Sequence, residues 1–154
     1  MTGRSSPLRR ALDININCSL AYGTLGTVLA WAGVPDESIA NNEFALKINP
    51  GDPINSHRYF GLALAHYLAF RHEKALDYAT VTLQLRPEWW LAHIVYTACL
   101  AQAGRSADAQ SARAELQRVR PQITIAALGD LPFAKASDRE HVADGLRKAG
   151  LPQT

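Results

Sequence analysis

The side chains of this 154-residue sequence that could do chemistry are five histidines and two cysteines. No two histidines stand three or four residues apart, the spacing that puts two zinc ligands on one face of a helix. The sequence also lacks a Gly-rich phosphate loop, a His-Glu-x-x-His motif and a Gly-x-Ser-x-Gly elbow. We therefore expect no enzyme, no cofactor and no metal site. The histidines are His57, His66, His72, His93 and His141.

Two further patterns have plain structural explanations. Cys18 and Cys99 lie far apart and form no Cys-x-x-Cys pair, so we expect reduced, packed thiols and no disulfide. Asp138, His141 and Asp144 recur every three residues, and we interpret them as part of a solvated helix face. The alternative, a small enzyme that uses the histidines, lacks an acid, a base and a nucleophile that converge by spacing.

Composition restricts the partners. The formal net charge is only +2 and the arginines are spread along the chain, so we expect no nucleic-acid partner. The segment from Met1 to Pro7 is polar and lacks the apolar run of a secretory signal. The most apolar stretch, Leu20 to Val34, is too short and too rich in glycine to span a bilayer. We expect one cytoplasmic domain, residues 1–154, with no membrane contact.

A repeat organises this domain. The block Tyr22-x-x-Leu25-Gly26 returns as Tyr59-x-x-Leu62-Ala63 and again as His93-x-x-Tyr96-Thr97, at spacings of 37 and 34 residues. The second halves of the units keep the same offsets and end at Pro50, Pro87 and Pro121. The three extra residues fall in the turn-rich segment 51–55, where an insertion costs little.

These residue types at this period resemble the tetratricopeptide repeat. The resemblance implies an all-α fold, a right-handed superhelical solenoid of about three helical hairpins, whose product is a binding surface. The helical pattern predicts first helices at 19–31, 55–69 and 88–103, and second helices at 36–48, 72–85 and 106–119. We divide the chain into a remnant of a preceding repeat at 8–16, repeats at 19–52, 56–89 and 90–122, and a C-terminal capping segment at 123–154.

Several positions depart from the repeat pattern. Gly33 and Gly104 are predicted to close the first helix of a hairpin in a left-handed conformation, whereas the middle repeat has Phe70-Arg71 there. Asn42 stands where the pattern has Phe, and His66 and His93 replace aromatic residues. We expect these three polar residues to be hydrogen-bonded in or near the core.

The two ends of the domain are predicted to differ. Leu8 to Ile14 matches the second helix of a repeat whose first helix is missing, so an uncapped edge would leave apolar surface for self-association. At the other end, Ser137-x-x-Glu140 has the form of a capping box ahead of Val142 and Leu146, which are at helical spacing. We expect a capping helix there with a polar outer face.

By analogy with tetratricopeptide repeats, the first helices would line a concave groove that binds a partner segment. This groove is mostly apolar and suits an amphipathic helix or an extended segment of a protein or peptide. Two alternatives stay open: the chain's own segment Ile123 to Leu151 fills the groove, or these residues simply pack between helices. The groove candidates are Trp31, His57, Phe60, Leu64, Tyr67, Leu91, Ile94 and Gln102.

A second resemblance concerns the end of the chain. Leu131-Pro132-Phe133 and the stretch from Gly145 to Pro152 are similar to the tails of bacterial class III adenylate/guanylate cyclases that carry tetratricopeptide repeats. It implies a regulatory tail without the catalytic domain, because nothing in the chain matches the metal-binding aspartates of that domain. This is our alternative to a general protein-interaction or scaffolding module.

Overall fold

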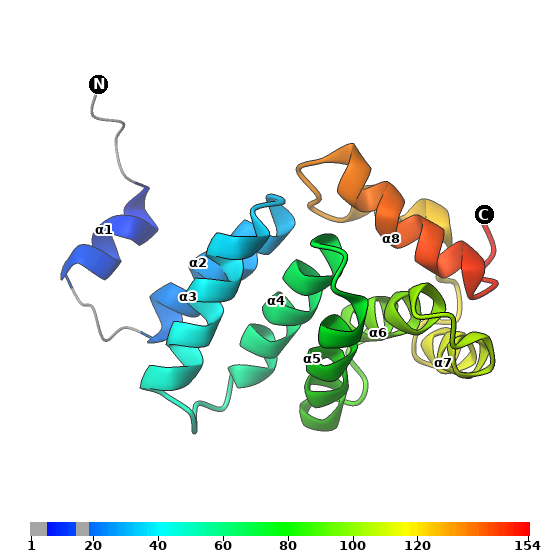
Figure 1. Ribbon diagram of the computed structural model, residues 1–154, viewed down its shortest axis with the longest axis horizontal. Helices are drawn as coiled ribbons and strands as arrows, with labels where there is room; N and C mark the ends of the chain where they lie inside the picture. Colours follow the sequence, from blue (N-terminus) through cyan, green and yellow to red (C-terminus); the bar gives the residue numbers. More distant parts are fainter. Residues whose placement is uncertain (1–5, 15–18) are drawn as a thin grey trace.

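The computed structural model describes residues 6–14 and 19–154, and in those residues all regular structure is helical (Figure 1). The six helices expected from the repeat are α2 to α7, with ends that differ by at most two residues from the prediction. A short first helix and a C-terminal helix complete the set. The bounds are α1 Pro7–Ile14, α2 Ser19–Trp31, α3 Pro35–Ile48, α4 Asn55–Leu68, α5 His72–Leu85, α6 Trp90–Gln102, α7 Ser106–Val119, the 3₁₀ helix η1 Ile125–Asp130 and α8 Ala136–Lys148.

The helices form consecutive hairpins, α2/α3, α4/α5 and α6/α7, that follow one another across the molecule (Figure 1). The first helix of each hairpin packs on the first helix of the next, α2 on α4 and α4 on α6. Helix α1 contacts α2 at the beginning of the series. The all-helical solenoid expected from the sequence is therefore confirmed.

Small residues let the first two hairpins approach closely. A Cβ atom on Gly26 of α2 would lie 2.5 Å from the Asn42 amide nitrogen of α3, and one on Gly61 of α4 would lie 2.7 Å from the same nitrogen. Three helices thus converge on a single asparagine, which is fully buried. The amide fits only because both neighbouring helices present glycine.

The turns inside the hairpins follow the prediction and add one finding. Gly33 and Gly104 both have φ 76°, the left-handed conformation expected after a first helix. Phe70, at the equivalent position of the middle repeat, has φ 62°. A phenylalanine in this region of backbone space is strained, since its Cβ crowds the following carbonyl.

The polar departures from the repeat each make a hydrogen bond, as expected. The Asn42 amide donates to the Ser38 carbonyl at 3.0 Å, and an imidazole nitrogen of His93 lies 2.7 Å from the Pro87 carbonyl. His66 accepts a hydrogen bond at Nδ1 from the Arg71 guanidinium at 3.0 Å. The prediction of hydrogen-bonded residues in the core is confirmed for all three positions.

The C-terminal helix begins differently from the prediction. Lys135 occupies the N-cap position of α8, and no side chain there caps the helix. Ser137 lies one residue inside the helix, so the capping-box prediction is wrong. The start of α8 is instead fixed by a contact with the turn after α2, since the Lys135 ammonium donates to the Gly33 carbonyl at 2.8 Å.

Further expectations concern the cysteines, a metal site and a membrane span. Cys99 is a free, buried thiol, while Cys18 lies outside the described residues. Within residues 6–14 and 19–154 no group of three or more potential metal ligands gathers. None of the helices in this part of the chain is long and apolar enough to cross a membrane.

Candidate interaction groove

The first helices α2, α4 and α6 line one face of the solenoid, which we call the groove face. The C-terminal segment, residues 131–151, covers part of this face by packing α8 against α6. Val142 and Leu146 of α8 are buried in the same apolar cluster as Leu64 and Ile94 of the groove face. The chain thus fills part of its own groove.

The loop ahead of α8 reaches back to the first hairpin. The ring of Phe133 packs edge-on against Trp31 with centroids 4.9 Å apart, and the Ala134 amide donates to the Trp31 carbonyl at 3.0 Å. Just past the other end of the segment, the Ile125 amide of η1 donates to the Pro152 carbonyl at 3.0 Å. The C-terminal segment is therefore anchored on α2 at its beginning and on η1 just past its end.

Polar contacts join α8 to the middle of the groove face. The Tyr67 hydroxyl donates to the backbone carbonyl of His141 at 2.7 Å. The Gln102 amide donates to that hydroxyl and to the Asp144 carboxylate, both at 3.2 Å, and accepts from the Lys148 ammonium at 2.9 Å. These bonds satisfy the polar groups of two predicted groove residues, Tyr67 and Gln102, within the chain.

Two histidines from distant parts of the sequence meet at this contact. His72, the first residue of α5, and His141 of α8 bring their Nε2 atoms to 3.0 Å. Both side chains are half-buried, and burial lowers the pKa of His72 and lowers that of His141 to about 4. The solvated-face interpretation is therefore wrong for His141, because its imidazole packs against Tyr67, Phe70 and His72.

The remaining part of the groove face, between α2 and the beginning of α4, is open. It holds a cavity of about 310 Å³ lined by Leu20, Thr24, Val28, Ile54 and His57, with Gly23, Thr27 and Arg58. Three of the lining side chains are large, apolar and strongly exposed: Leu20 at 58%, Val28 at 54% and Ile54 at 38%. We call this cavity the open groove.

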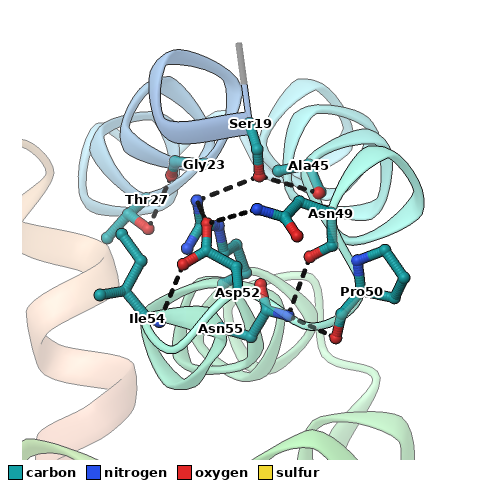
Figure 2. A network of polar contacts seen from close by, with 10 residues as sticks. Ser19, Gly23, Thr27, Ala45, Asn49, Pro50, Asp52, Ile54 and Asn55 are labelled. Atoms are coloured by element: carbon teal, nitrogen blue, oxygen red, sulfur yellow. Dashed lines mark hydrogen bonds and ion pairs between the residues drawn. The ribbon is translucent and has the colours of Figure 1, made fainter. Parts of the chain in front are cut away.

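A buried ion pair supports the wall of the open groove. Arg58 is only 2% exposed, and its guanidinium lies 3.0 Å from the Asp52 carboxylate and donates to the Ser19 hydroxyl at 3.1 Å. Figure 2 shows how Ser19 and Asn49 of the first hairpin converge with Asp52 of the loop that follows it. The Ser19 hydroxyl in turn donates to the Ala45 carbonyl at 3.0 Å.

The segment that lengthens the first repeat, residues 51–55, supplies the carboxylate of this ion pair. Asp52 belongs to this segment, and its carboxylate also accepts from the Ile54 amide at 3.1 Å, which sets the position of Ile54 in the groove wall (Figure 2). The Asn55 amide donates to the carbonyls of Asn49 and Pro50. The inserted segment therefore has a structural role, because it positions one wall of the open groove.

Arg58 fits only because of a glycine. A Cβ atom on Gly23 would lie 2.6 Å from Nε of Arg58. Among the described residues, Nε and Nη1 of this guanidinium have no hydrogen-bond acceptor. A buried cation with unused donors thus lies directly beneath α2, at the base of the open groove.

The predicted groove residues divide into three groups by exposure. Phe60, Leu64, Tyr67 and Ile94 are buried by the chain itself, so no partner contacts them while α8 is docked. Trp31, Leu91 and Gln102 are partly buried against the same core or the C-terminal segment. His57 is exposed in the open groove.

His57 has cationic and aromatic neighbours. Its ring lies 4.9 Å from Trp89, and its Nε2 lies 3.4 Å from the Arg86 guanidinium. Partial burial and the charge of Arg86 lower the pKa of His57. This imidazole therefore offers a neutral, amphipathic wall to the open groove at neutral pH.

Sequence reasoning missed Val28, Ile54 and Arg58 as groove residues. Val28 was detectable, because it lies eight residues after Leu20 on the same helix face. Ile54 was not, since it lies outside a helix and its position depends on Asp52. Phe70 was recognised as an unusual turn residue, but its contact with His141 crosses the sequence and left no local signal.

Comparisons with known proteins show the fold. The crystal structure of MamA superposes with a TM-score of 0.69 at 17% sequence identity, over 92% of this chain and 82% of that one. A second match, "Crystal structure of YrrB: a TPR protein with an unusual peptide-binding site", has a TM-score of 0.42 at 16% identity over 94% and 91%. No protein-family model and no curated protein matches the sequence. The fold is a helical-hairpin solenoid of the tetratricopeptide-repeat type.

Proposed function

We propose that this chain is a protein-interaction module that binds an apolar segment of a partner in the open groove. The observation that carries the proposal is the set of exposed apolar side chains, Leu20, Val28 and Ile54, around a cavity of about 310 Å³. Exposed apolar groups that gather in a concavity are typical of binding sites, whereas scattered ones carry no such meaning. We assign no catalytic role to the chain.

The charges around the open groove suggest the chemistry of the partner. Its described lining has no carboxylate, the Arg58 guanidinium is buried and paired with Asp52, and the exposed guanidinium of Arg86 adjoins neutral His57. The hydroxyls of Thr24 and Thr27 supply the remaining polar groups. An apolar segment that carries an acidic side chain is therefore better matched than a basic one.

The test is a selection of peptides from a random display library on the immobilised full chain at neutral pH. The proposal predicts enriched peptides with two or more large apolar residues and an acidic one, whose bound position maps to α2 and the beginning of α4 by chemical cross-linking. Failure to enrich any sequence, or cross-links confined to the second helices α3, α5 and α7, would overturn it.

Two finer hypotheses concern the occupant and the setting. Homodimer formation through the amino-terminal edge is tested by light scattering at rising concentration, where a strict monomer would rule it out. The regulatory tail of a nucleotide cyclase remains a prediction from the sequence resemblance at 131–133 and 145–152. A cyclase domain encoded in the adjoining reading frame would support it, and an unrelated neighbourhood would count against it.

A further inference from the structure

The contact between α8 and the rest of the solenoid is built around one titratable pair. The imidazoles of His72 and His141 are 3.0 Å apart at Nε2, while their ring centroids are 5.2 Å apart. The centroid separation exceeds the Nε2 distance by about two ring radii, so the two nitrogens point at each other. This is the geometry of an N–H···N hydrogen bond, in which one ring donates and the other accepts.

Such a bond needs at least one neutral imidazole. If both rings carry a proton on every nitrogen, the acceptor is lost and two positive charges face each other at 3.0 Å. Two aromatic rings enclose the imidazole of His141. Phe70 stacks on His141 with centroids 4.1 Å apart and planes 19° apart, and Tyr67 covers the imidazole on the α4 side.

Groups on four helices surround the pair. On α8, Asp144 favours a charged His141 and Lys148 opposes it, and these two side chains pair with each other at 3.0 Å. On α6, Gln102 is uncharged, and Cys99 is a buried thiol whose pKa burial raises. On α4, burial raises the pKa of the Tyr67 phenol, which stays neutral. On α5, the neighbouring Glu73 is exposed.

We propose that the C-terminal segment is an acid-released latch: protonation of the His72–His141 pair undocks α8 from α6 and opens the covered part of the groove face. The latch would keep Tyr67 and Gln102 unavailable at neutral pH and present them to a partner at acidic pH. Its regulatory meaning rests on the proposed binding function, whereas the undocking itself does not.

The direction follows from linkage. Burial holds the pKa of both imidazoles below the ordinary value of 6.5 in the docked state, to about 4 for His141. The undocked state therefore takes up protons that the docked state does not, and docking weakens as pH falls from about 6.5 toward 4. Each histidine can change the equilibrium constant for docking by at most about tenfold per pH unit. Because both rings are partly exposed, we expect this constant to be only about five- to tenfold smaller at pH 5.5 than at pH 7.5.

Hydrogen exchange on the full chain without any partner tests the latch. Protection factors, corrected for intrinsic exchange, are measured for peptides of α8 and of α7 at pH 7.5 and 5.5. The proposal predicts that α8 is less protected than α7 at both pH values, because α8 opens without global unfolding, and that its protection falls five- to tenfold at the lower pH. In the His72→Gln/His141→Gln variant the acid response of α8 should disappear, whereas His57→Gln, an exposed histidine, should retain it.

Three results would overturn the latch: equal protection of α8 at both pH values, equal protection factors in α8 and α7 that mark global unfolding as the route of exchange for both, or an acid response that survives the double substitution. If the glutamines weaken docking at neutral pH, His72→Asn/His141→Phe replaces them. The same acid response must then be absent. Since no partner is present, failure of the latch is separate from failure of the peptide selection.

Discussion

Phe70 holds a left-handed backbone conformation, φ 62°, and stacks its ring on the imidazole of His141 4.1 Å away. The equivalent turns of the other hairpins use Gly33 and Gly104. The middle repeat thus accepts strain of about 1–2 kcal/mol at a residue that is 71% exposed. In this conformation the ring contacts α8, and this contact offsets part of the strain.

Phe70→Gly should separate these two effects. Relief of strain and loss of the stack, about 0.5–1.5 kcal/mol for an aromatic pair, nearly cancel in the free energy of unfolding. We expect urea denaturation to change by less than about 1 kcal/mol, while the exchange protection of α8 falls about three- to tenfold. Unchanged protection of α8 would contradict the role of the ring. Gly104→Ala is the control, and it should cost about 1 kcal/mol without affecting α8.

The close approach of Gly26 to Asn42 predicts a compensating pair. Gly26→Ala places a methyl group 2.5 Å from the Asn42 amide and should lower the free energy of unfolding by about 1–3 kcal/mol. In an Asn42→Ala background the same change should be neutral or stabilising, because alanine favours the helix by about 1 kcal/mol over glycine. A double-mutant cycle from urea denaturation measures the difference. Equal costs in the two backgrounds would show that Asn42 is not the obstacle.

The buried ion pair predicts an asymmetric response. Asp52→Ala leaves the Arg58 guanidinium, 2% exposed, without its counter-ion, and should cost about 3 kcal/mol. Arg58→Met removes the buried charge itself, so it should cost less, and Asp52→Ala/Arg58→Met should recover part of the loss. The readout is the free energy of unfolding from urea denaturation followed by circular dichroism. A double variant less stable than Asp52→Ala would contradict the asymmetry.

His66 predicts a pH dependence of global stability. Burial, with Arg71 and Lys74 nearby, lowers the pKa of His66 to about 4, so the folded chain binds fewer protons than the unfolded one. Its contribution is complete above pH 6.5 and is lost as pH falls toward 4. We expect about 1 kcal/mol less stability at pH 5 than at pH 7 from this residue. The His66→Phe variant can still stack on Tyr78, and its free energy of unfolding should depend less on pH. An unchanged pH dependence would mean that another group causes it.

The sequence predicted the elements well because the repeat is a local signal. Gly33 and Gly104 mark turns whose conformation depends on a few neighbouring residues, and the structure has them as expected. The site was less predictable. The groove positions of Phe60 and Tyr67 followed from helix geometry, but their burial depends on α8, which is distant in sequence.

Two contacts explain this limit. His72 and His141 lie 69 residues apart, and Asp52 was in a segment that looked like a neutral insertion because its partner Arg58 belongs to the next helix. Neither pairing has a periodic pattern. Only the packing of the hairpins brings these side chains together, so a reading of local spacing cannot find them.

The measurement that tests the central claim most directly compares two exposed apolar residues with the same exposure. Val28 lies in the open groove and Leu85 at the end of α5, and each is 54% exposed. A peptide selected on the native chain is titrated by calorimetry at pH 7.5 against Val28→Asp and Leu85→Asp. The account predicts at least tenfold weaker binding for Val28→Asp and less than a twofold change for Leu85→Asp. Equal affinities for the two variants, or a loss confined to Leu85→Asp, would contradict it.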